Sequence, residues 1–72
     1  MKVIATFDVN GETVARLMID DNEVYHVESD IFGHTTRIIG KKRFNEAIHS
    51  FTSVIKFEYI MKHNKQYKIQ GD

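Results

Sequence analysis

Four cationic side chains lie close together where the segment RIIGKKRF leads into a helix-like pattern. Arg37, Lys41, Lys42 and Arg43 surround the expected start of that helix. Unpaired backbone amides and the helix dipole attract negative charge at such a position. Together with arginine and lysine side chains, these amides can hold a phosphate group. The four residues are therefore a candidate site for a phosphate ligand, a nucleic acid or an acidic partner.

The same cations have a second explanation within the chain. They can pair with the acidic turn at residues 20–23, or with Glu46 one helical turn further on. The chain has ten basic and ten acidic residues, whereas strong binding of a polyanion is favoured by a net basic surface. Internal pairing is the preferred explanation, and nucleic-acid binding stays open as the alternative.

Acidic and basic residues are separated along the chain. Residues 1–30 hold two basic and seven acidic side chains, whereas residues 31–72 hold eight basic and three acidic side chains. Such asymmetry is typical of a protein that binds a charged partner, or of one whose two halves attract each other. Asp20, Asp21 and Glu23 form a candidate surface for a basic partner, although acidic residues also favour turns because they hydrogen-bond the backbone there.

No arrangement of residues indicates catalysis or a bound metal. The chain has no cysteine, which excludes a disulfide, a thiolate nucleophile and a cysteine-containing zinc site. Its four histidines are scattered singly, and no nucleophile elbow, P-loop or dinucleotide fingerprint is present. We therefore expect no catalytic residue, no metal and no cofactor in this protein, which is not expected to be an enzyme.

Three segments of alternating apolar and polar residues predict an antiparallel meander. They cover residues 3–9, 13–19 and 23–28. Asn10-Gly11 between the first two is typical of a type I′ hairpin turn, and Asp20-Asp21-Asn22 predicts the second turn.

The next segments predict a short strand at residues 35–39 and then a helix from Lys41. Phe44, Ala47, Ile48 and Phe51 fall on one stripe of that helix, and the positions between them are polar. The helix is amphipathic and about three turns long, with Gly40 as its N-cap.

Residues 54–62 fit two structures. As a strand they match the alternating pattern at seven of eight positions, and their aromatic and β-branched residues agree. We therefore predict a strand at 54–62, a turn at 63–65 and a short final strand at 67–70. In the alternative, the helix runs on to Asn64, reaches about 36 Å at 1.5 Å per residue, and exposes an apolar face that calls for a dimer.

These segments predict one α+β domain over residues 1–72. An antiparallel sheet, made of the N-terminal three-stranded meander and one or two C-terminal strands, packs against one amphipathic helix. Phe32, Ile60 and Tyr67 have no obvious place in the interior, so they are candidates for an interface or a second small core.

The function that fits these features best is a small non-enzymatic protein-binding module. We expect a homodimer that acts as a regulator or inhibitor by occupying another protein's surface. Neither a signal peptide nor a membrane span is found, which favours the cytoplasm and no membrane partner. The short, lysine- and isoleucine-rich chain also suits an accessory protein of a phage or mobile element.

Overall fold

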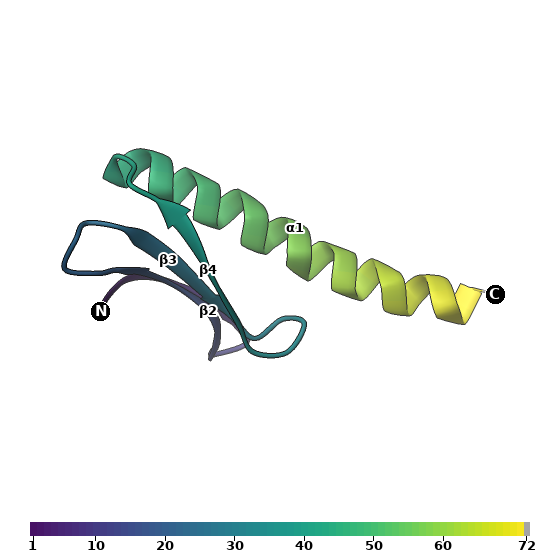
Figure 1. Cartoon of the computed structure of the whole chain (residues 1–72). Coiled ribbons are helices and arrows are strands. Elements are labelled where there is room, and N and C mark those ends of the chain that lie inside the picture. The colour runs from purple at the N-terminus through teal and green to yellow at the C-terminus, as the bar shows by residue number, and fades with distance from the viewer. Residues whose placement is uncertain (72) are drawn as a thin grey trace.

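The computed structural model describes the backbone of residues 1–71 and the side chains of residues 1–63. Its elements are β1 (Lys2–Val9), β2 (Glu12–Ile19), β3 (Tyr25–Ser29), β4 (Thr35–Gly40) and α1 (Phe44–Gly71). The strands form one antiparallel sheet in the order β1-β2-β3-β4, and α1 lies across one face of it (Figure 1). The predicted α+β fold, an antiparallel sheet packed against one helix, is confirmed.

Local turn chemistry accounts for the meander of β1, β2 and β3. Asn10 and Gly11 have φ angles of 52° and 84°, and positive φ at both central residues is the requirement of a type I′ turn. At the second turn, Oδ1 of Asp20 accepts hydrogen bonds from the backbone N–H groups of Asn22 at 2.8 Å and Val24 at 3.0 Å. Both predicted turns are confirmed.

The fourth strand is confirmed, but the start of the helix differs from the prediction. Gly40 is the last residue of β4, where it pairs with Tyr25 at a φ of 87°. Because α1 begins at Phe44, the N-cap position falls on Arg43, and the prediction of Gly40 as N-cap is wrong. Arg43 precedes the first helical residue, Phe44.

Residues 54–62 continue α1, so the strand predicted there is wrong, as are the turn at 63–65 and the strand at 67–70. Ile55 is fully buried and Tyr59 half-buried, four and eight positions after Phe51, and they extend the helical stripe. No glycine or proline interrupts residues 44–70. As a strand, these residues would place Phe57 and Met61 on the same face as Ile55 and Tyr59, whereas in the helix they are 63% and 48% exposed.

The core lies between α1 and the face of the sheet beneath it. Its buried apolar side chains are Ala15, Leu17, Tyr25, Val27, Ile31, Ala47, Phe51 and Ile55. The buried Ser29 Oγ accepts a hydrogen bond from the backbone N–H of Ile31 at 3.2 Å, so this hydroxyl does not lack a partner. Phe44 was predicted on the buried stripe but is 53% exposed at the first position of α1.

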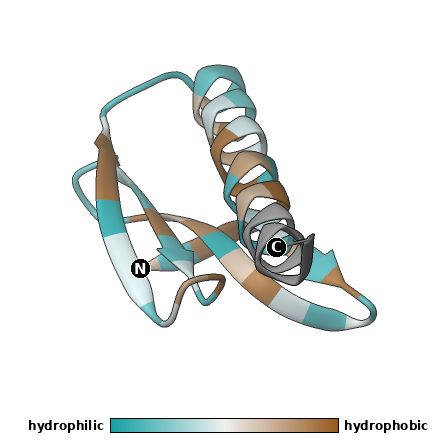
Figure 2. Ribbon diagram, turned by 90° about the vertical axis from the view of Figure 1, so that its right-hand side faces the viewer, coloured by the Kyte–Doolittle hydropathy of each residue, from teal (hydrophilic) through white to brown (hydrophobic). Residues whose placement is uncertain are grey.

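The helix covers only part of the sheet and extends past it. At 1.5 Å per residue, the 28 residues of α1 span about 42 Å, whereas an eight-residue strand spans about 26 Å. α1 packs against β1, β2 and β3, and residues 35–38 of β4 are exposed. In Figure 2, β4 lies to one side of α1, and the loop that follows β4 connects it to the start of α1.

Candidate functional site

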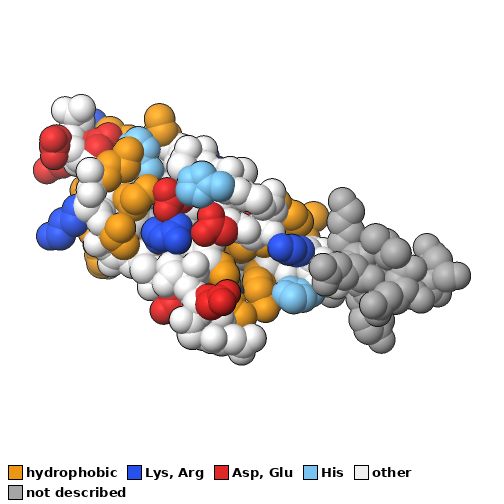
Figure 3. Space-filling view, turned by 90° about the horizontal axis from the view of Figure 1, so that it is seen from below, with side chains coloured by type: hydrophobic (Ala, Val, Ile, Leu, Met, Phe, Trp, Pro, Cys, Tyr) orange, Lys and Arg blue, Asp and Glu red, His pale blue; other side chains and the backbone are white. Residues whose placement is uncertain are grey.

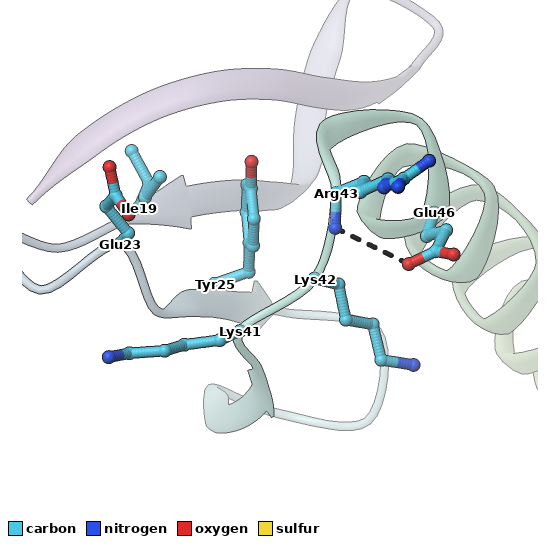
Figure 4. Close-up of a pocket in the computed structure, with 7 residues that line it drawn as sticks. All are labelled: Ile19, Glu23, Tyr25, Lys41, Lys42, Arg43 and Glu46. Atoms are coloured by element: carbon cyan, nitrogen blue, oxygen red, sulfur yellow. Dashed lines mark hydrogen bonds between the residues drawn. The ribbon is translucent and has the colours of Figure 1, made fainter.

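Three of the four predicted cations lie at one pocket. Lys41, Lys42 and Arg43 form the exposed connection between β4 and α1. They line a pocket of about 520 Å³, whose other lining residues are Ile19, Glu23, Tyr25 and Glu46. Figure 4 shows the two lysine side chains extending in different directions. The cations share a pocket, but the lysines do not converge on one point.

Two carboxylates line the same pocket as these cations. Glu46 is the third residue of α1, and its Oε2 accepts a hydrogen bond from the backbone N–H of Arg43 at 3.4 Å (Figure 4). This contact is the glutamate half of a capping box. Glu23, from the acidic turn, lines the pocket as well. Both kinds of internal partner considered for the cations are therefore near them.

The fourth predicted cation, Arg37, lies elsewhere. It projects from β4 on the side of the helix, and its Nη2 forms an ion pair with Oε1 of Glu58 on α1. The exposed fractions of the two side chains are 49% for Arg37 and 18% for Glu58. This ion pair neutralises both charges and links β4 to α1, so Arg37 does not add to the pocket at the helix start.

The acidic residues of the turn have different roles. Oδ2 of Asp20 lies 2.9 Å from Nε2 of His26, while its Oδ1 holds the turn. The hydrogen bond with His26, followed by that from Val24, lowers the pKa of Asp20 below its usual value. Asp21 and Glu23 are exposed, and Glu23 has a φ of 62°. Only these two of the three predicted acidic residues present their carboxylates outward.

An ion-pair network that was not predicted from the sequence lies on the sheet face away from α1. Arg16 Nη1 lies 2.6 Å from Oε1 of Glu28, and Nη2 lies 3.4 Å from Oδ2 of Asp30. His34 Nδ1 lies 2.9 Å from Oδ1 of Asp30. This hydrogen bond is the main cause of a lowered pKa of Asp30. Acidic, basic and histidine side chains lie side by side on this face in Figure 3.

Large apolar side chains gather between α1 and β4. Phe32, Val54, Phe57 and Met61 line a depression of about 430 Å³, together with Thr35, Arg37 and Glu58. A second depression, of about 240 Å³, shares Arg37 and Val54 with the first and continues along β4 to Ile39 and Lys42. We call these two adjoining depressions the β4–α1 groove.

The three predicted interface residues lie apart. Phe32, between β3 and β4, is 51% exposed and belongs to the groove. Ile60 is 54% exposed on α1 and does not line the groove, and the side chain of Tyr67 lies outside the described residues. Val54, Phe57 and Met61 were not among the predicted interface residues. Their spacing of three and four residues marks one side of a helix, but the strand prediction concealed it.

Comparisons with protein-family models, with curated proteins and with solved structures found no match to this chain. Among the side chains that the structure describes, no cluster of three or more potential ligands could hold a metal ion. None of the helical residues described here forms a segment with the length and hydropathy of a membrane span.

Proposed function

We propose that this chain is a small non-enzymatic protein-binding module, active in the cytoplasm, that binds protein through the β4–α1 groove. The observation that carries the proposal is the exposure of four large apolar side chains in one groove: Phe32 at 51%, Val54 at 40%, Phe57 at 63% and Met61 at 48%. Phenylalanine and methionine are enriched in protein interfaces. Covering them with another protein removes apolar surface from water, which is the main favourable term in association.

The charge of the groove agrees with this role. The charges of its ion pair, Arg37 with Glu58, cancel within the chain, and arginine is enriched in protein interfaces. Lys41 and Lys42 lie near one end of the groove, where a rim of charge guides encounter and orientation. A module of this kind acts by occupying a surface, as a regulator or inhibitor does. An accessory protein of a phage or mobile element is the origin we propose.

Photo-crosslinking in the host cell tests the proposed binding surface. A photoreactive phenylalanine analogue replaces Phe57, and a matched variant carries it at Thr52, which is exposed on the same helix about 140° around its axis. We expect a protein adduct from position 57 and little or none from position 52. Equal adducts from both positions, or none from either, would contradict the proposed surface.

Anion binding at the start of α1 is the second candidate function. Three cations around one pocket favour it, while Glu23 and Glu46 in that pocket oppose it by repelling an anion. The test is a titration at low salt with inorganic phosphate and with duplex and single-stranded DNA and RNA. Binding that is lost in the double variant Lys41→Ala, Lys42→Ala would support this function. No binding with a dissociation constant below about 100 μM, the weak end of the usual non-specific range, would exclude it.

A further inference from the structure

One hydrogen bond fixes the direction of the backbone groups along β3. The N–H of Asp30, directly after β3, donates to the carbonyl oxygen of Val14 on β2 at 2.8 Å. Residues along an antiparallel strand direct their backbone groups to its two neighbours in turn. Ser29 and Val27 therefore direct their N–H and C=O groups toward β4, which is the last strand of the sheet.

The free edge of β4 presents the backbone groups of Thr36 and Ile38. Thr35 and Arg37 lie opposite Ser29 and Val27, so their backbone groups face β3. Those of the alternate residues, Thr36 and Ile38, face away from the sheet, and each residue offers one N–H donor and one C=O acceptor. Residues 35–38 are exposed, so this edge is accessible.

The two edges of the sheet differ in regularity. Two register shifts interrupt the pairing of β1, and bulges of this kind make an edge a poor template for a further strand. In β4, by contrast, the pairing is regular from residue 35 to residue 38. The charged side chain in this stretch, Arg37, is neutralised by Glu58. The edge of β4 is therefore the one that is open to a further strand.

A strand added to this edge would also cover the β4–α1 groove. Neighbouring strands lie about 4.8 Å apart, and alternate side chains of a strand point to the same face. Every second side chain of the added strand would thus lie beside Phe32, Phe57 and Met61, which are exposed in the groove. A helix would satisfy its own backbone groups and leave those of Thr36 and Ile38 unused.

The charge at one end of the groove indicates the polarity of its occupant. Lys42, which follows β4, lines the groove and forms no ion pair among the described side chains. A strand antiparallel to β4, the orientation of all neighbours in this sheet, begins at this end. Acidic residues at its start would complement Lys42. Residues 31–40 contain no acidic side chain, so β4 of a second copy would not supply them.

We propose that the free edge of β4 binds an extended segment of a partner protein, which joins the four-stranded sheet as an additional strand antiparallel to β4. The segment exchanges backbone hydrogen bonds with Thr36 and Ile38. Its alternate apolar side chains cover the groove, and acidic residues at its N-terminal end lie near Lys42. This inference rests on the proposed function, because it specifies the kind of segment that the groove binds.

Peptide selection on the full chain supplies probes without assuming one sequence. The probe is a displayed library of random peptides of about twelve residues, longer than a usual strand. We expect enriched peptides with apolar residues at alternate positions, preceded by acidic residues. Fluorescence anisotropy then gives their dissociation constants. Phe57→Asp should raise these constants about tenfold or more, as for a residue at the centre of an interface.

A proline at the free edge tests the backbone contacts. Thr36→Pro removes an outward N–H and no hydrogen bond within the sheet, and proline is tolerated at such edge positions. We expect it to raise the dissociation constants about tenfold or more. The matched control is Thr6→Pro on β1. Thr6 lies opposite Arg16, whose backbone groups face β3, so the N–H of Thr6 also points outward. This control should keep the wild-type constants, and circular dichroism verifies that each variant retains its fold.

N-methylated peptides give a second readout that leaves the protein unchanged. Only every second N–H group of an added strand faces β4. N-methylation of one alternate set of peptide nitrogens should therefore weaken binding about tenfold or more. N-methylation of the other set should change it little. Binding through apolar side chains alone would not distinguish the two sets.

Several results would overturn the added strand. They are a selection without enriched peptides, binding that a folded Thr36→Pro leaves unchanged, or equal effects of the two N-methylated sets. A dimer that Thr36→Pro dissociates, in a chain that binds no peptide, would assign the edge to a second copy. If one of these results is found while the analogue at position 57 captures a protein, this inference fails and the proposed function stands. If the analogue captures nothing and no peptide binds, both fail.

Discussion

Replacing Ile55 by alanine tests whether the second half of α1 is part of the folded core. Ile55 is fully buried, and the change removes three carbon atoms, worth about 2.4 kcal/mol at ~0.8 kcal/mol each. The cavity left behind raises the expected loss to about 2–5 kcal/mol. For 72 residues, a total stability of about 4–11 kcal/mol is usual. The variant should therefore lose a large part of its free energy of unfolding.

The assay is urea unfolding followed by circular dichroism, at a protein concentration low enough to keep any dimer dissociated. Phe57→Ala is the matched control, because Phe57 lies two positions further along α1 and is 63% exposed. Its cost at low concentration should stay below about 1 kcal/mol, since exposed sites contribute little. A loss under about 1 kcal/mol for Ile55→Ala, or equal losses in both variants, would refute the packing of α1 described here.

Three further predictions concern pH, capping and a turn. The pKa of Asp20 is lowered in the folded state, so its contribution to stability is present above the unfolded pKa of about 3.9 and is lost as the pH falls through the folded pKa. The stability gap between wild type and Asp20→Asn, measured by urea unfolding, should shrink below about pH 4, and a constant gap would contradict this. Arg43→Ser should complete the capping box with Glu46 and raise the free energy of unfolding by about 0.5–1 kcal/mol; a loss would mean that the arginine stabilises the helix start in another way. Gly11→Ala should cost about 1 kcal/mol in the same assay because of the φ of 84° at that position, and an unchanged midpoint would argue against the type I′ turn.

Structure determined by neighbouring residues could be predicted from the sequence. Asn10-Gly11 accepts positive φ at both positions, and the Asp20 carboxylate holds its turn by accepting hydrogen bonds from the backbone N–H groups of Asn22 and Val24. Alternating burial then fixes the side of each strand that faces the core. For these reasons the meander was predictable without any knowledge of the helix.

The structure of residues 54–62 depends on contacts with distant residues. Their sequence satisfies both an alternating pattern and the helical stripe of Phe51 and Ile55. The helix places Ile55 in one buried cluster with Leu17. Such contacts with distant residues override the strand propensity of the segment. Besides that stripe, the absence of a glycine or proline was the sign that the helix continues.

The candidate site was predictable only in part, for the same reason. Phe32 could be identified as an apolar residue without a place in the core, and Lys41 and Lys42 as part of a basic segment. The ion pair of Arg37 with Glu58 joins residues 21 positions apart and requires α1 to continue past Ser53. Once residues 54–62 were assigned to a strand, neither that ion pair nor the stripe of Val54, Phe57 and Met61 could be found.

The most direct test of the central claim, that the apolar side of α1 binds protein, is NMR of the isotope-labelled chain titrated with the protein that the analogue at position 57 captures. The account predicts chemical-shift changes at Val54, Phe57 and Met61, which line the groove. Shift changes confined to Met18 and Ile38, on the open face of the sheet, would contradict it, as would the absence of any change at concentrations of about 200 μM, at which complexes of moderate affinity form.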